Sequence, residues 1–406
     1  MFYEKNILLL YFGKLSSVMG SSIYTFAIGL YVLSMTGSGL SFSVNIALSI
    51  VPVVLISPFA GVIADRFNKK TVMVAMDMLS AAAMLFLYIF SSRYELSVSA
   101  VYTATFFMAV INTAFSITTE SIIPEIVQPD QLIGVNAVSR IIDSASAILG
   151  PVLGGMVFAF VDIRLFILIN AVSFFISSLS EMFIEYTPLE VRHNADESVK
   201  VQIRNAAEYI WGYKEVLRIF AALVFLNFSL GLAVNVPLPY ILNTVLKIDP
   251  AGYGLTQSFV PIGIITGAIA VQKVMEKLDY SRLLLRVSFV LGVLMGLLGL
   301  PVTPAMRYLL TPDMYVPYYS IILFFMGICI SLIDIPLIYK LQTSIDEAMR
   351  GRVLSIGITI AKIVLPAALI LSGVLINIVP IYTICIFGGL VLIMSNFLVF
   401  RVYAKI

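Results

Sequence analysis

Several charged residues lie inside long apolar stretches of this 406-residue chain, where a charge is costly and usually serves a function. Among them are Lys14, Arg140, Asp143, Asp334 and Lys362. Arg140 and Asp143 lie one helical turn apart, so a helix would place them on one face. Asp143 could pair with Arg140, with Lys14 or with both, and Asp334 could pair with Lys362. An acid beside such cations is a candidate proton carrier, whereas the plainer interpretation is a set of neutralised pairs that hold helices together.

The stretches that contain these charges have the length and composition of membrane-spanning helices. Hydrophobic residues make up 60% of the chain and charged residues only 12%, against roughly a quarter in a soluble protein. A helix needs about 20 mostly apolar residues to cross a bilayer. The runs are continuous rather than alternating, which favours helices over a barrel. The sequence therefore predicts an all-α integral membrane protein with twelve transmembrane helices at roughly 6–34, 42–64, 71–91, 97–121, 132–160, 163–185, 216–245, 252–275, 282–303, 316–344, 352–377 and 380–402.

One polar, charged segment divides the twelve predicted spans into two sets of six. We expect an N-terminal six-helix bundle over 1–185, a linker over 186–215 and a C-terminal six-helix bundle over 216–406. Most of the 25 lysine and arginine residues fall in segments on the same side as the N-terminus. The loops on the other side hold only Arg93, Arg164, Lys247 and Arg307. Because positively charged loops stay in the cytoplasm, both termini are expected to be cytoplasmic.

A short charged link joins the second and third predicted spans. It contains Gly61, then Asp65 and Arg66, then Asn68, Lys69 and Lys70. A link this short is no domain linker, and its cations indicate a cytoplasmic hairpin. Asn68 suits the left-handed turn that such a hairpin would need, second only to glycine.

This pattern resembles the signature loop of the major facilitator superfamily, with Asn68 in place of the usual glycine. In that family the loop belongs to a charge network that latches the two halves shut on the cytoplasmic side. The resemblance implies that Gly61, Asp65, Arg66, Lys69 and Lys70 form this latch. Glu120, at the inner end of the fourth predicted span, is expected to meet Lys69 or Arg66 there. The alternative is an ordinary positively charged cytoplasmic loop.

A second motif lies in the fifth predicted span, where Gly150-Pro151 is followed by Gly154-Gly155. Small residues let neighbouring helices approach closely, and the proline permits a bend. The motif resembles the antiporter motif of exporters that exchange substrate against protons, which implies a hinge at these four residues. The alternative is a generic small-residue helix contact.

The stretch 349–355 resembles the efflux branch that includes macrolide exporters. One departure is that the fourth predicted span lacks the arginine that proton-coupled drug exporters often have.

Polar residues recur at helical spacing in spans that would line a central cavity. We expect the substrate cavity to include Tyr24, Asn112, Ser116, Asn227 and Asn235. A large, mostly apolar cavity with few polar anchors suits a bulky amphipathic ligand. A sugar pocket would carry more polar and tryptophan side chains, and the chain has a single tryptophan.

Together these features predict a secondary active transporter of the plasma membrane. It is expected to export hydrophobic or amphipathic drug-like compounds, macrolide-like by resemblance, by proton antiport with alternating access. Asp143 is the first candidate proton carrier and Asp334 the second. The alternative substrate is a siderophore, a lipid-like molecule or another metabolite; a membrane enzyme or a channel is a further alternative, although no catalytic, metal-binding or nucleotide-binding motif is evident. We expect no cofactor, no nucleic-acid partner and a monomer in the lipid bilayer.

Overall fold

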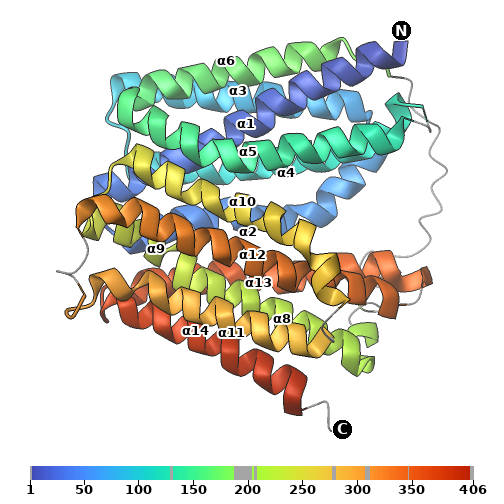
Figure 1. Ribbon diagram of the computed structural model, residues 1–406. Helices are drawn as coiled ribbons and strands as arrows, with labels where there is room; N and C mark the ends of the chain where they lie inside the picture. The colour runs from blue at the N-terminus through green and yellow to red at the C-terminus, as the bar shows by residue number, and fades with distance from the viewer. Residues whose placement is uncertain are drawn as a thin grey trace. The chain divides into compact units, whose positions relative to one another are not determined.

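The computed structural model describes residues 2–128, 131–186, 204, 208–276, 280–306, 311–345 and 347–402. In this part of the chain every regular element is a helix (Figure 1). Eleven helices are long and apolar enough to cross a membrane, and one further apolar helical stretch, Thr359–Leu375, is shorter. The all-helical membrane fold predicted from the apolar runs is confirmed.

The helices form two compact units, which we call unit N and unit C. Unit N comprises Met1–Thr36, Leu48–Arg192 and Asp249–Ser258, and unit C comprises Gly37–Ala47, His193–Ile248 and Phe259–Ile406. The linker expected over 186–215 lies mostly outside the described residues. All the sites described below lie within one unit or the other.

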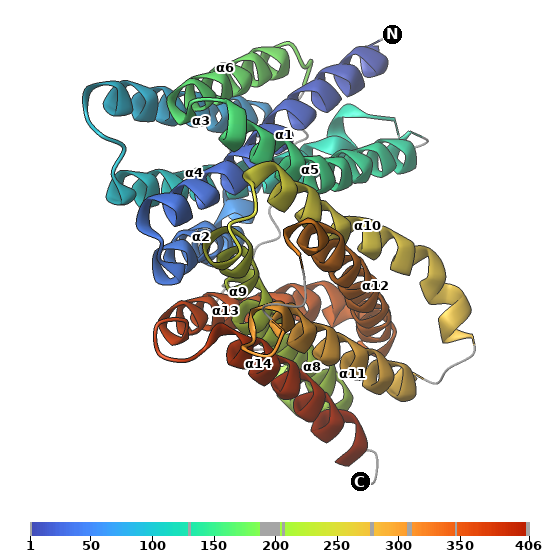
Figure 2. The same cartoon turned by 60° about the vertical axis from the view of Figure 1, so that its left-hand side comes forward.

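Unit N is built mainly from the first six helices. They are α1 (Phe2–Thr36), α2 (Gly39–Arg66), α3 (Lys69–Arg93), α4 (Val98–Ile126), α5 (Leu132–Phe160) and α6 (Ile163–Met182). Helix α1 packs against α5 and α6, while α3 packs against α4 and α6 (Figures 1 and 2). Helix α6 is therefore the element that packs against both α1 and α3.

Polar residues at the helix starts set several of these boundaries. Asn68 caps α3 by accepting a hydrogen bond from the Thr71 amide at 3.1 Å, and Ser97 and Asp162 cap α4 and α6 in the same way. The left-handed turn expected at Asn68 is wrong, because its φ of −61° and ψ of 113° are extended. An asparagine that caps the following helix needs this extended backbone, so capping decides its conformation here.

The core of unit N has two apolar clusters along the length of its helices. One includes Tyr24, Met84 and Phe174, and the other includes Leu10, Met73 and Ile184; members of both clusters come from or directly follow α1, α3 and α6. On each of these three elements the two clusters are separated by two or more helical turns. Side chains of α1, α3 and α6 that lie between the two clusters are therefore enclosed by apolar side chains at both ends.

Unit C contains the remaining spans. They are α8 (Lys214–Leu230), η1 (Gly231–Asn235), α9 (Pro237–Pro239), η2 (Tyr240–Val245), most of α10 (Pro250–Met275), α11 (Tyr280–Leu298), η3 (Leu300–Val302), α12 (Pro312–Ser344), α13 (Glu347–Leu375), α14 (Ile381–Phe397) and η4 (Leu398–Val402). The seventh span is interrupted by π-helical turns on either side of Pro237 and Pro239. A proline supplies no backbone N–H, so one α-helical hydrogen bond is lost at each of these two prolines. Helix α14 packs against α8 and α11 (Figure 1).

Candidate functional site

A buried ion pair joins α1 to α5 inside unit N. Lys14 Nζ lies 3.0 Å from the Asp143 carboxylate and donates to Ser139 Oγ at 3.0 Å. The lysine side chain is 7% exposed and that of Asp143 33% exposed. Ser139 and Asp143 lie one turn apart on α5, so both face the same ammonium group. Of the partners predicted for Asp143, the structure has Lys14; Arg140 is exposed and forms no ion pair with any described residue.

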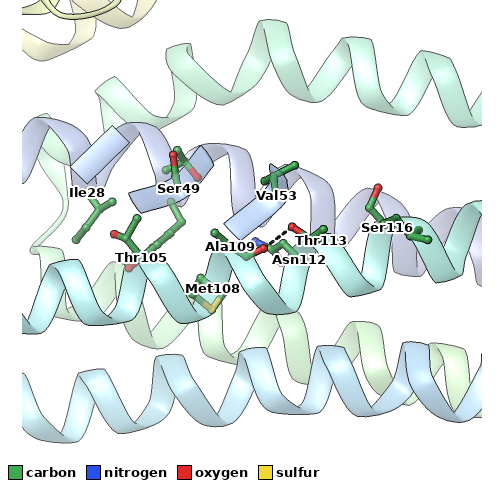
Figure 3. Close-up of a pocket in the computed structure, with 12 residues that line it drawn as sticks. Ile28, Ser49, Val53, Thr105, Met108, Ala109, Asn112, Thr113 and Ser116 are labelled. Carbon is green, nitrogen blue, oxygen red and sulfur yellow. Dashed lines mark hydrogen bonds between the residues drawn. The ribbon is translucent and has the colours of Figure 1, made fainter. Parts of the chain in front are cut away.

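Two pockets of unit N share the side chains of Asn112 and Ser116. The larger, about 320 Å³, lies between α1, α2 and α4 and includes Tyr24, Ser49 and Thr105 (Figure 3). The smaller, about 210 Å³, is lined by Lys14, Ser17, Val18, Ser21, Phe115, Thr119 and Asp143 in addition to the two shared residues. Because the pockets have these side chains in common, the ion pair adjoins the larger pocket.

The surface of the larger pocket is mostly apolar, although seven of its twelve lining residues carry a polar group. Ile28, Val53 and Met108 supply apolar surface, and the buried Tyr24 hydroxyl faces Thr105. Figure 3 shows the polar Asn112 and Ser116 following one another along α4, one turn apart. Such a lining can bind a ligand that is largely apolar and has a few hydrogen-bonding groups.

The predicted cavity residues are divided between the units. Tyr24, Asn112 and Ser116 line the larger pocket together. Asn227 and Asn235 belong to unit C, where the Asn227 amide donates to the Leu223 carbonyl within α8 at 2.9 Å and Asn235 ends η1. The structure thus brings three of these five residues together in one site.

The loop motif makes one ion pair among its described side chains, and its acid is not the predicted one. Lys69 pairs with Glu125 and also donates to the Ser121 carbonyl at 3.3 Å. Glu120, the expected partner, is exposed. The reason is that α4 continues through Pro124 to Ile126, beyond the predicted end at 121, so Glu125 rather than Glu120 lies at its end.

Tyr186 completes this contact from the segment after α6. Its hydroxyl donates to Glu125 Oε2 at 2.6 Å. Burial and the bond to the Glu125 carboxylate raise the pKa of Tyr186 above its ordinary value. Lys70 is half-buried and forms no ion pair with any residue that the structure describes. The side chains of the motif's other members, Gly61, Asp65 and Arg66, lie outside the described part of the chain.

The predicted hinge glycines sit at close helix contacts of unit N. A Cβ on Gly150 would overlap the Ser22 hydroxyl of α1, and one on Gly154 would lie 3.0 Å from Phe26. A Cβ on Gly155 would overlap the Pro250 carbonyl at the start of α10, close to where Pro151 meets Gly254. Close packing at these positions therefore requires glycine, as predicted for small residues in this motif.

In unit C, the second predicted charge pair is not in contact. Asp334 of α12 is half-buried and Lys362 of α13 is exposed. No salt bridge within 4.0 Å joins them in the part of the chain that the structure describes, although the charge of Lys362 still acts on Asp334. The pair is predicted because the two residues have equal depth on two helices. Equal depth does not fix the direction in which each side chain points.

Sequence reasoning missed a pair of buried acids in unit N, Asp77 of α3 and Glu181 of α6. Each is 1% exposed, and Ser17 of α1 lies 2.5 Å from Asp77. Each acid interrupts a predicted span, which is the signal that could have identified both.

Comparison with known proteins agrees with the fold. The family model described as Major Facilitator Superfamily matches residues 10–369. Macrolide efflux protein A from Streptococcus pyogenes is 24% identical over 370 residues, which cover 89% of this chain and 87% of that protein.

Two solved transporters share the fold. The nucleoside transporter NupG has a TM-score of 0.75 at 13% identity, covering 98% of this chain and 99% of its own. A bacterial homologue of the iron transporter ferroportin, in an inward-facing state, has a TM-score of 0.72 at 15% identity, covering 98% of both chains. Because the family model covers most of its length, the chain is a member of the Major Facilitator Superfamily, a multi-pass membrane transporter.

Proposed function

We propose that this transporter exports hydrophobic or amphipathic, macrolide-like compounds in exchange for protons. The observation that carries the proposal is the sharing of Asn112 and Ser116 between the mostly apolar pocket and the pocket that contains Lys14 and Asp143. A substrate in the larger pocket would contact two residues that also line the pocket of the ion pair. The similarity of this chain to a macrolide efflux protein supports the proposed substrate class.

Asp143 is the proposed proton acceptor of this site. Its side chain is 33% exposed, so a proton from water can reach the carboxylate. Protonation of Asp143 removes the charge that holds Lys14, which weakens the contact between α1 and α5. Substrate binding next to a released ammonium group and proton binding at Asp143 would then influence each other. Asp334 is the second candidate and lies in unit C.

The remaining parts of the proposal follow the family resemblance. Two six-helix bundles, over 1–185 and 216–406, would alternate access to the substrate, with 186–215 as linker and the glycines around Pro151 as hinge. The chain would be a monomer in the plasma membrane with both termini in the cytoplasm and would catalyse no covalent change. The latch would comprise the loop motif from Gly61 to Lys70, with Glu125 as the acid.

The test is accumulation of a radiolabelled macrolide panel in cells that express the protein, with and without a protonophore. We expect lower accumulation that the protonophore restores, and loss of this effect in Asp143→Asn. Arg140→Gln is the matched control, since Arg140 lies one turn away and is exposed. An unchanged accumulation across the panel would exclude macrolide export, and siderophores and lipid-like metabolites would be tested next.

The latch is tested separately by Asp65→Asn. A latch that stabilises one conformation should change the transport rate more than the substrate affinity. Equal rates for Asp65→Asn and the unmodified protein would remove the latch from the proposal and leave the substrate pocket unaffected.

A further inference from the structure

A row of hydrogen bonds connects α3, α1 and α6 between the two apolar clusters of unit N. Ser17 Oγ lies 2.5 Å from Asp77 Oδ2 and 2.8 Å from Ser177 Oγ, and Ser177 Oγ lies 2.9 Å from the Gly13 carbonyl. Three hydrogen bonds need three protons, but two serine hydroxyls supply only two and a carbonyl can only accept. The complete row therefore requires a proton on the Asp77 carboxyl group.

Glu181 lies one turn beyond Ser177 on the same face of α6. Its side chain is 1% exposed, and neither carboxyl oxygen has a hydrogen-bond partner among the described residues. Gly13 of α1 makes room for it, since a Cβ there would lie 3.0 Å from Oε1. An ionised carboxylate buried without a donor is far more costly than a neutral acid, so this site favours a protonated Glu181.

Glu181 interacts electrostatically with Asp77, and neither acid forms an ion pair within 4.0 Å with a cation in the part of the chain that the structure describes. Charged groups of the helices of unit N include Lys14, Lys69, Glu120, Glu125, Arg140 and Asp143. Lys14 is bonded to Asp143 and Lys69 to Glu125, whereas Glu120 and Arg140 are exposed. Lys70 lies two turns from Asp77 on α3, about 10 Å along the helix.

A separate polar group also points to a small ligand at this place. Ser80, one turn from Asp77 on α3, is fully buried, and its hydroxyl has no hydrogen-bond partner among the described residues. The clusters around Met73 and Met84 close α3 on either side of this position. A site so enclosed, rich in oxygen and without an ion-paired cation among the described residues, suits a proton, which needs no coordination shell.

We propose that Asp77 and Glu181 form a second proton-binding site, distinct from Asp143, which takes up and releases a proton during the transport cycle. Proton binding follows from this geometry alone. The role in transport rests on the proposed antiport function. On release, the proton would pass from a carboxyl oxygen to water that enters the layer when α1 moves relative to α6, and the pair would be left with one more negative charge.

Infrared difference spectroscopy of the purified protein in lipid tests the site directly. Spectra are compared between mildly acidic and alkaline buffer for the unmodified protein and for Asp77→Asn, Glu181→Gln, the double variant and Asp143→Asn. We expect a carboxylic-acid carbonyl band that disappears in alkaline buffer. Either single variant at this site should shift or remove it, the double variant should abolish it, and Asp143→Asn should leave it in place.

Glu181→Gln keeps the test usable if Asp77→Asn fails to fold, because the Glu181 oxygens take part in no hydrogen bond to any described residue. An unchanged band in Glu181→Gln and the double variant, or no pH-dependent carboxyl band in the unmodified protein, would overturn the proposal.

Protonophore-sensitive efflux is measured in the same variants. We expect it to fall at least about tenfold in Asp77→Asn and Glu181→Gln. Efflux that the protonophore does not change, together with the expected pH-dependent carboxyl band, would reject antiport and would still support the proton site. Proton-driven efflux without the band would reject the site and leave antiport standing.

Discussion

Helix α1 meets its neighbours on two faces that differ in chemistry. Towards α5, Lys14 is paired with Asp143, and Ser22 donates to the Ser146 carbonyl at 2.9 Å. Towards α3 and α6, serines of α1 meet acids and hydroxyls, and no described cation balances the acids. Helix α1 thus faces an acid paired with its own Lys14 on one side, which we call the compensated face. On the other side, which we call the enclosed face, it faces two acids without a bonded cation among the described residues.

The difference shows two ways in which an acid can be accommodated between the helices of a membrane protein. An acid that borders a pocket can stay ionised if a cation is bonded to it, as Asp143 is to Lys14. An acid enclosed by apolar clusters without a cation is tolerated in its neutral form, which is how we interpret Asp77 and Glu181. Replacing an acid by its amide should therefore destabilise the protein on the compensated face and change its stability little on the enclosed face.

The largest effect is expected on the compensated face, for Lys14→Met. This change leaves Asp143 without its cation, so the free energy of unfolding should fall by about 2–3 kcal/mol, less than for a fully buried pair. Efflux should fall at least about tenfold. Thermal unfolding of the detergent-purified protein and drug accumulation measure the two effects. Arg140→Met is the control and should change neither; equal losses in both variants would contradict the assignment of the pair.

The next effect concerns how closely α1 approaches α5. Gly150→Ala places a methyl group where the Ser22 hydroxyl lies, and overpacking of this kind costs about 1–3 kcal/mol. Gly134→Ala is the matched control on the same helix, because a Cβ at Gly134 meets no atom within 4 Å. That control should stabilise the helix by about 0.5–1 kcal/mol. Thermal unfolding of both variants makes the comparison, and equal stabilities would show that α1 can move away from α5 without loss.

The sequence predicts the compensated face better than the enclosed one. Long apolar runs fix the spans because a bilayer allows little else, and a lysine and an acid within spans indicate a pair. Lys14 is one of the partners that the sequence predicts for Asp143. The sequence does not pair Asp77 with Glu181, because their interaction depends on α3 packing beside α6, and nothing local in either helix specifies that neighbour.

The ends of helices and the conformation of residues between helices are also hard to predict from the sequence. The sequence favours Glu120 because the predicted fourth span ends at 121, whereas helix α4 tolerates Pro124 and continues to Ile126. The residue type of Asn68 suits a turn, whereas the hydrogen bond that it accepts from the Thr71 amide makes it a cap. Both errors arise where a single residue type suits two local structures and only the neighbouring chain decides between them.

A smaller effect should separate the acids of the two faces. Asp143→Asn breaks an ion pair and should lower the free energy of unfolding by about 1–2 kcal/mol, allowing for its partial exposure. Glu181→Gln replaces a neutral acid with a neutral amide of the same shape and should stay within about 0.5 kcal/mol. Denaturant or thermal unfolding of the two variants in parallel measures the difference. A loss in Glu181→Gln as large as that in Asp143→Asn would indicate an ionised Glu181.

The smallest effect is expected at the Lys69 and Glu125 contact, which follows the compensated pattern. Tyr186→Phe removes one hydrogen bond to Glu125 and should lower the free energy of unfolding by about 1 kcal/mol. Burial raises the pKa of the Tyr186 phenol above 10.0, so this contribution is fully present below pH 10.0 and is lost only as pH rises through the higher folded-state value.

The Tyr186→Phe difference should therefore be constant between mildly acidic and mildly alkaline buffer, as measured by thermal unfolding at several pH values. Tyr11→Phe is the control, because the Tyr11 hydroxyl makes no hydrogen bond to any residue that the structure describes. A Tyr186→Phe loss that changes across this range would contradict a bond between a neutral phenol and a carboxylate that keeps its charge. The Lys69 contact would then resemble the enclosed acids more than the Lys14 pair.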